Sequence, residues 1–112
     1  MIYTVIMTER AARDIEDAAD WWARERSAEQ ASRWYQGIRA AINGLARSPE
    51  ARPVAAERDL FPYEIRELHY GLGAKPTHRA IFTIVCQTVL VLAVRHAARR
   101  PLRPDDLARP DA

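Results

Sequence analysis

The chain has 112 residues, of which 48% are apolar and 29% charged, and its formal net charge is +2. This length and composition are typical of one soluble domain with a single modest core. The single cysteine excludes an internal disulfide and a cysteine-rich metal site. No apolar run approaches the roughly 20 residues of a membrane span, and the start lacks the pattern of a signal peptide, so we expect a cytoplasmic protein.

Positive charge is unevenly distributed along the chain. Residues 66–100 contain six basic residues and one acidic residue, whereas residues 1–65 contain nine basic and eleven acidic residues. Nearly all the basic residues are arginine, whose planar guanidinium binds carboxylates and phosphates through two parallel hydrogen bonds. The C-terminal half is therefore the better candidate for contacts with an acidic or anionic partner.

The N-terminal part of the sequence predicts one strand followed by two helices. Residues 2–7 are good strand formers, and Thr8 is a suitable N-cap for a helix that runs to about Arg26. Ser27 can cap a second helix from about residue 28 to 46, which the Ser48-Pro49 pair ends. Each helix carries an apolar stripe at helical spacing. The short link between them predicts an antiparallel helix hairpin.

Three tryptophans and a tyrosine lie on these predicted helices. Trp22, Trp34 and Tyr35 follow the apolar stripes, so we expect them in the core. Trp21 lies off the stripe. It either packs at the margin of the stripe or faces a partner.

The C-terminal half predicts three strands. Residues 50–62 form a proline-punctuated loop, and residues 63–70 alternate as a strand. Two long apolar runs, 77–86 and 89–100, flank the short polar step Gln87-Thr88 and predict a β-hairpin. The second run is apolar almost throughout, so it should lie mid-sheet with both faces covered. Cys86 ends the first run, and we expect it to be a plain buried thiol.

The predicted order is β-α-α-β-β-β, which indicates an α+β fold with both helices on one face of an antiparallel sheet. The other face must be partly solvated, concave by twist, or covered by a partner. We divide the chain into one domain, residues 1–100, and a tail, residues 101–112. Prolines and charged residues dominate the tail, so we expect no regular structure and partial disorder there.

This order of elements resembles the RelE/ParE toxin superfamily of bacterial type II toxin–antitoxin systems over residues 2–100. The matching pieces are, in chain order, Tyr3-Thr4-Val5 with Thr8 and Ala11-Ala12, then Leu45-Ala46-Arg47-Ser48-Pro49, Ile65-Arg66-Glu67-Leu68, His78-Arg79-Ala80-Ile81-Phe82, and Val89 to Val94 leading into Arg95-His96. The histidine and arginines after the last strand are more similar to the ParE branch than to the RelE branch.

The resemblance implies a toxin that inhibits growth, for example in plasmid stabilisation, and that a cognate antitoxin from an adjacent gene wraps and neutralises. In the ParE-like branch the implied target is DNA gyrase, without a nuclease site. In the RelE-like branch the implied activity is cleavage of messenger RNA on the ribosome. A third interpretation is a non-toxic interaction module. Whether the protein is an enzyme stays open, and no cofactor is implied.

The residues that could carry these functions gather on the predicted strands. A ribonuclease would use His96 as acid or base and Arg79 and Arg66 to bind phosphate. RNA-cleaving relatives often carry a tyrosine late in the chain, whereas no tyrosine follows Tyr70 here, which favours the ParE-type function. A surface for the target or antitoxin would comprise Arg66, Arg79, Arg95, His96, Arg99, Arg100 and Trp21.

Each of these residues also has a purely structural interpretation. Arg66 and Arg79 could pair with helix carboxylates such as Glu16 or Asp20, and His96 could simply end a strand. The three histidines are spread over three predicted strands without paired ligand spacing, so they do not predict a metal site. The decisive question is whether the arginines and His96 meet on one uncovered face of the sheet.

Overall fold

The computed structural model describes residues 2–108 and contains one sheet, a helix pair and a short C-terminal helix. Strand β1 (Thr4–Met7) leads into helices α1 (Glu9–Glu25) and α2 (Ala28–Asn43). Strands β2 (Arg66–Tyr70), β3 (His78–Val85) and β4 (Thr88–His96) follow, and α3 (Pro104–Ala108) comes last. The predicted α+β class and the order β-α-α-β-β-β are confirmed.

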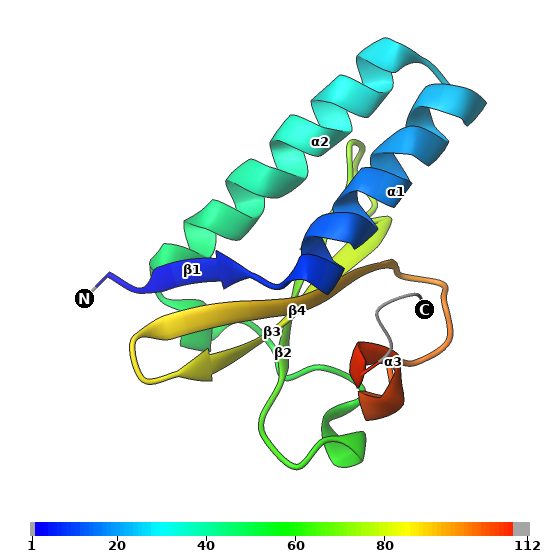
Figure 1. Cartoon of the computed structure of the whole chain (residues 1–112). Helices are drawn as coiled ribbons and strands as arrows, with labels where there is room; N and C mark the ends of the chain where they lie inside the picture. Colours follow the sequence, from blue (N-terminus) through cyan, green and yellow to red (C-terminus); the bar gives the residue numbers. More distant parts are fainter. Residues whose placement is uncertain (1, 109–112) are drawn as a thin grey trace.

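The helix pair begins where the capping chemistry predicts. The Thr8 hydroxyl accepts a hydrogen bond from Ala11 N, and the Ser27 hydroxyl accepts one from Gln30 N. The two helices lie side by side on one face of the sheet (Figure 1). The second helix ends earlier than predicted, at Asn43, and a tight turn over Gly44–Ala46 completes it.

The sheet has the strand order β1-β4-β3-β2, with β1 parallel to β4 and the other pairs antiparallel. Strand β4 is therefore central, as its apolar sequence predicted, and residues 89–95 are almost all buried. Strand β2 is shorter than predicted, because regular pairing starts only at Arg66.

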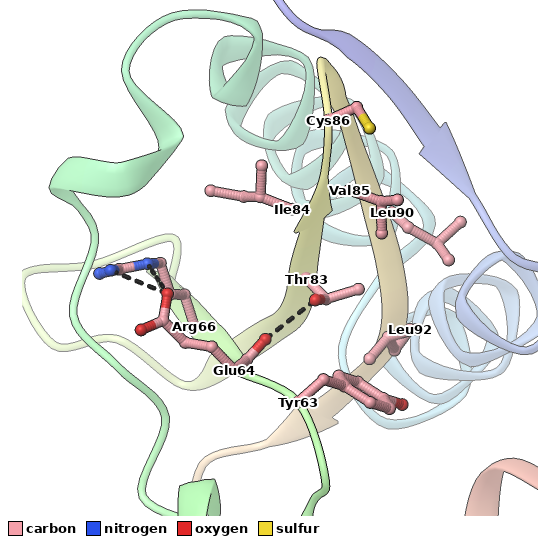
Figure 2. Close-up of a pocket in the computed structure, with 9 residues that line it drawn as sticks. All are labelled: Tyr63, Glu64, Arg66, Thr83, Ile84, Val85, Cys86, Leu90 and Leu92. Atoms are coloured by element: carbon pink, nitrogen blue, oxygen red, sulfur yellow. Dashed lines mark hydrogen bonds and ion pairs between the residues drawn. The ribbon is translucent and has the colours of Figure 1, made fainter.

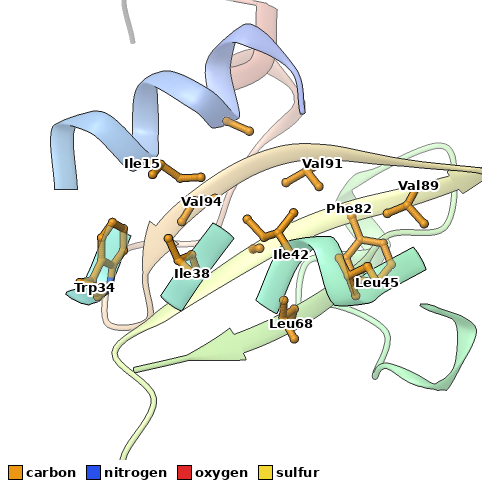
Figure 3. Close-up of a cluster of buried hydrophobic side chains, with 12 residues drawn as sticks. Ile15, Trp34, Ile38, Ile42, Leu45, Leu68, Phe82, Val89, Val91 and Val94 are labelled. Carbon is orange, nitrogen blue, oxygen red and sulfur yellow. The ribbon is translucent and has the colours of Figure 1, made fainter. Parts of the chain in front are cut away.

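The main core lies between the helix pair and the sheet. Ile15 comes from α1, Trp34 and Ile38 from α2, and Phe82 and Val91 from the two central strands (Figure 3). All five are at most 1% exposed. Trp34 is thus a core residue as predicted, while Trp22 and Tyr35 are partly buried against this cluster.

A second core covers the opposite face of the sheet. Residues from the 55–65 loop and from the C-terminal segment pack on Ile81, Leu92 and Ala93, and they include the fully buried Ala55, Ile65 and Leu102. Figure 1 shows this loop and α3 on the side of the sheet away from α1 and α2. This face is covered by the chain itself, an arrangement that the sequence did not predict.

Two local predictions are wrong. Residues 104–108 form α3, and Leu102 is buried, because an apolar side chain between the prolines docks on the second core. Residues 109–112 of the predicted tail lie outside the described residues. Cys86 is exposed rather than buried, because it lies in the turn between β3 and β4 with a positive φ of 56°.

Candidate functional site

Strand alternation separates the predicted site residues. In the β3–β4 ladder His78 pairs with His96, and Arg79 pairs with Arg95 on the next rung. Neighbouring residues of a strand point to opposite faces. The His78 ring contacts Trp34 of α2, so the two histidines face the helix pair. Arg79 contacts Glu57 of the loop, so the two arginines face the second core. The expected single surface with Arg79 and His96 is therefore not formed.

Arg79 is buried in an ion pair with Glu57. Its Nη1 lies 2.7 Å from Glu57 Oε1, and its Nη2 donates to Glu57 Oε2. Glu57 Oε2 also accepts a hydrogen bond from Leu102 N at 2.7 Å. Arg79 is 7% exposed and Glu57 2%. This guanidinium is therefore already occupied by a carboxylate, and a phosphate would have to displace it.

The pKa values of this pair reflect the same contacts. Hydrogen bonding to Glu57 raises the pKa of Arg79, although burial opposes the rise. Burial acts to raise the pKa of Glu57, but the hydrogen bonds from Arg79 and Leu102 outweigh it and lower that pKa. Both groups are held in their charged forms.

Glu67 and His69 extend this network along β2. Arg79 Nη1 lies 3.7 Å from Glu67 Oε1, which also accepts a hydrogen bond from Ala56 N at 3.0 Å. His69 Nε2 lies 2.6 Å from Glu67 Oε2. Glu57, Arg79, Glu67 and His69 thus form a connected polar network on the far face, which we call the arginine network. Its hydrogen bonds explain how two acidic residues tolerate burial.

Arg95 is the second buried arginine on this face. It is 3% exposed and donates from Nη2 to Arg100 O at 3.0 Å, while its Nε is buried without a partner among the described residues. Burial lowers its pKa, and the nearby Arg99 adds to the effect. Arg100 forms two 2.9 Å hydrogen bonds to Asp106. Arg99 is exposed and forms no ion pair within residues 2–108.

Arg66 lies apart from Arg79. It pairs with Phe82, three rungs along the β2–β3 ladder from the His69–Arg79 pair, a separation of about 10 Å at the usual rise of a strand. Arg66 contacts Glu64 at 3.0 Å and donates to Arg52 O at 2.6 Å. The predicted partners Glu16 and Asp20 are therefore wrong for both arginines, whose carboxylates come from the loop and from β2.

The helix side of the sheet carries an aromatic pocket of about 390 Å³, which we call the indole–imidazole pocket. Its lining comprises Ala18, Trp21, Trp22, Arg26, Thr77, His78 and His96. The two imidazole rings are 5.3 Å apart, centre to centre, and the two indole rings 5.5 Å. Burial, with a smaller contribution from His96, lowers the pKa of His78 to about 4, so its ring is neutral at pH 7.

A second, more open pocket of about 670 Å³ lies where β3 extends beyond β2. Figure 2 shows Tyr63, Arg66 and Leu92 around it, with Cys86 at the hairpin turn. Thr83 Oγ1 donates to Glu64 O at 2.9 Å and fixes the loop against the strand. The lining of this pocket contains one arginine, Arg66, which is already paired with Glu64. The pocket therefore offers apolar contacts rather than an unpaired positive charge.

No three histidine, cysteine, aspartate or glutamate side chains in residues 2–108 come together as a ligand group. Among the same residues, none of the helices has the length and apolar content needed to span a bilayer.

Two residues of these sites, Glu57 and His78, were not predicted from the sequence. Glu57 lies in a loop without periodicity, and its partners are 22 and 45 residues away, so no local signal marks it. His78 was not among the predicted site residues, although it lines the indole–imidazole pocket. The alternation of side chains along β4 could have predicted that the histidines and arginines lie on different faces, because the adjacent residues Arg95 and His96 must point to opposite sides of a sheet.

Solved structures with a similar fold include three from toxin–antitoxin systems. The chromosomal ParDE system from Pseudomonas aeruginosa aligns with a TM-score of 0.69 at 18% identity, covering 85% of this chain and 96% of that chain. A mutant of the Escherichia coli toxin RelE in the free state gives 0.58 at 17% identity, covering 88% and 86%. The RelBE2 toxin–antitoxin complex from Mycobacterium tuberculosis gives 0.50 at 22% identity, covering 86% and 99%.

Sequence comparison identifies the family. Curated protein sequences give no significant match. The family model described as the ParE toxin of the type II toxin–antitoxin system parDE matches residues 5–101, which is most of the chain. The helix pair, the four-stranded sheet and the arginine network all lie within or beside that range. The chain therefore belongs to the ParE toxin family of type II toxin–antitoxin systems.

Proposed function

We propose that this toxin inhibits growth by binding DNA gyrase without covalent chemistry of its own, and that an antitoxin encoded beside it neutralises it. Membership of the ParE family supports the toxin role. The target is inferred from the ParE-like branch that the sequence resembles. The localisation consistent with this role is the cytoplasm, where gyrase works.

The observation that carries the proposal is that the carboxylates of the arginine network already occupy Arg79. Cleavage of RNA through its 2′-hydroxyl needs a base, an acid and a free cation around one phosphate. Arg79 is instead neutralised by Glu57 and Glu67, and His96 lies on the opposite face of the sheet. These residues support a folded binding module better than a nuclease centre.

Exposed cationic residues at the end of β4 are the best candidates for contact with the target. Arg99 is exposed and unpaired among the described residues, whereas Arg100 is already held by Asp106. Arginine at an accessible rim steers association with an acidic surface. We therefore assign the target contact to Arg99, with Arg100 as a weaker contributor.

The test combines an assay of the purified protein with an assay of its expression in cells. Purified toxin should inhibit supercoiling by gyrase, and expression in cells should arrest growth while messenger RNA stays intact. Arg99→Glu should weaken gyrase inhibition at least fivefold, and Arg33→Glu, an exposed change on α2, should not. Rapid ribosome-dependent transcript decay with active gyrase would replace this proposal with the ribonuclease alternative. Harmless expression would indicate the non-toxic module.

A further inference from the structure

We propose that the indole–imidazole pocket receives an acidic segment of the antitoxin, through one large apolar side chain that lies beside a carboxylate. This inference rests on the assignment of the chain to a toxin–antitoxin pair, and it is independent of the identity of the target. The pocket is distinct from the arginine network, because the two lie on opposite faces of the sheet.

The walls of the pocket are built for an apolar group. Trp21 is 45% exposed, although burial would normally favour so large an apolar side chain. It stands edge-on to Trp22, and the imidazole of His78 backs onto the buried Trp34. The volume of about 390 Å³ falls in the range of roughly 300–1,000 Å³ typical of ligand pockets. Rigid aromatic walls of this kind are typical anchor sites at interfaces.

The charge around the pocket favours a carboxylate. Arg26, at the C-terminal end of α1, is the only permanently charged residue of the lining, and its guanidinium forms no ion pair within residues 2–108. None of the acidic residues in the described part of the chain lines the pocket, and the exposed carboxylates of Asp17 and Glu25 on α1 lie outside the lining. A carboxylate at the rim would therefore meet a free arginine without facing a like charge.

The polar ring atoms of the lining include one buried indole nitrogen and one exposed imidazole. Trp22 Nε1 is buried without a hydrogen-bond partner among the described residues. His96 Nδ1 accepts from Ala98 N at 3.1 Å, so neutral His96 carries its proton on Nε2. A peptide carbonyl or carboxylate would supply an acceptor for His96 Nε2, whereas a purely apolar ligand would leave this donor unmatched.

The first test uses a small probe and the intact chain. N-acetylphenylalanine, which combines an aromatic ring with a carboxylate, should shift the Trp21 and Trp22 indole resonances in NMR spectra. Its uncharged amide should bind at least threefold more weakly. Arg26→Gln should abolish that difference, whereas Arg24→Gln, a matched change at an exposed position two residues earlier, should preserve it. Equal binding of acid and amide, or the absence of any shift, would overturn the proposal.

The second test uses the antitoxin encoded by the neighbouring reading frame. Trp21→Ala should weaken its binding at least tenfold and Arg26→Gln about threefold, in calorimetry with variants whose melting temperatures match the parent. Arg24→Gln, which is exposed and lies outside the lining of the pocket, should leave antitoxin affinity unchanged. Wild-type affinity of Trp21→Ala would refute the pocket assignment. Because gyrase is absent from this experiment, failure of the gyrase proposal would leave its outcome unaffected.

Discussion

Glu57 and Arg79 form a buried ion pair that joins a loop to a central strand, although 22 residues separate them in the sequence. The same carboxylate accepts a hydrogen bond from Leu102 N, so one side chain connects the loop, the sheet and the C-terminal segment. This pair holds the loop against the far face of the sheet, and it leaves the Arg79 guanidinium unavailable to an anionic ligand.

Replacing Glu57 by Ala should destabilise the fold by about 3–5 kcal/mol, because removal of one partner leaves a buried guanidinium uncompensated. Urea denaturation at pH 7 measures the loss. Glu16→Ala, on the exposed surface of α1, is the control and should stay within about 0.5 kcal/mol. The double change Glu57→Met with Arg79→Met should recover much of the stability. A loss below 1 kcal/mol for Glu57→Ala would contradict the buried pair.

Leu102 tests whether the C-terminal segment belongs to the folded unit. It is 0% exposed in the second core, so Leu102→Ala should cost about 2–5 kcal/mol. Thermal or urea unfolding provides the measurement. Leu60→Ala is the matched control, since Leu60 is 49% exposed, and its effect should be small. Equal effects of the two changes would mean that the segment does not dock in solution.

His78 should make stability fall with acidification. Its folded pKa of about 4 lies below the usual value of 6.5, so the unfolded chain binds the proton more readily. The contribution is fully present above about pH 6.5 and is lost as the pH falls towards 4. After allowance for screening by solvent in the pocket, the loss is about 1–2 kcal/mol.

The measurement for His78 is urea denaturation at pH 7.5 and pH 5, compared between the parent chain and His78→Asn. Other groups titrate in both proteins, so only the difference between their pH dependences reports on His78. The parent should lose more stability than the variant. Identical pH dependences would show that His78 titrates normally in the folded protein.

Gly71 is required by a close approach of the backbone. A Cβ atom there would lie 2.5 Å from Lys75 O and 3.0 Å from the Cα of Pro76. Gly71→Ala should therefore destabilise by about 1–3 kcal/mol, since backbone atoms must shift. Gly73→Ala, in the same turn with open space around it, should change little. Equal melting temperatures for the two variants would contradict this packing.

Local pattern determined the secondary structure and much of the fold. Thr8 and Ser27 cap the helices because their hydroxyls bond to backbone groups only three residues away. The apolar run of β4 had to be central, since only a strand covered on both faces is apolar throughout. Such features follow from interactions between neighbours in the chain.

The tertiary structure alone decided which charges are free. The sequence predicted Arg79 to be an available cation. In the structure Arg79 is paired with Glu57, which lies in a loop without periodicity. Leu102, between prolines, became a core residue only because the second core offered it a site. Contacts between distant segments leave no local periodicity, so the sequence suggested the toxin fold while the packed chain set which of its arginines a partner can reach.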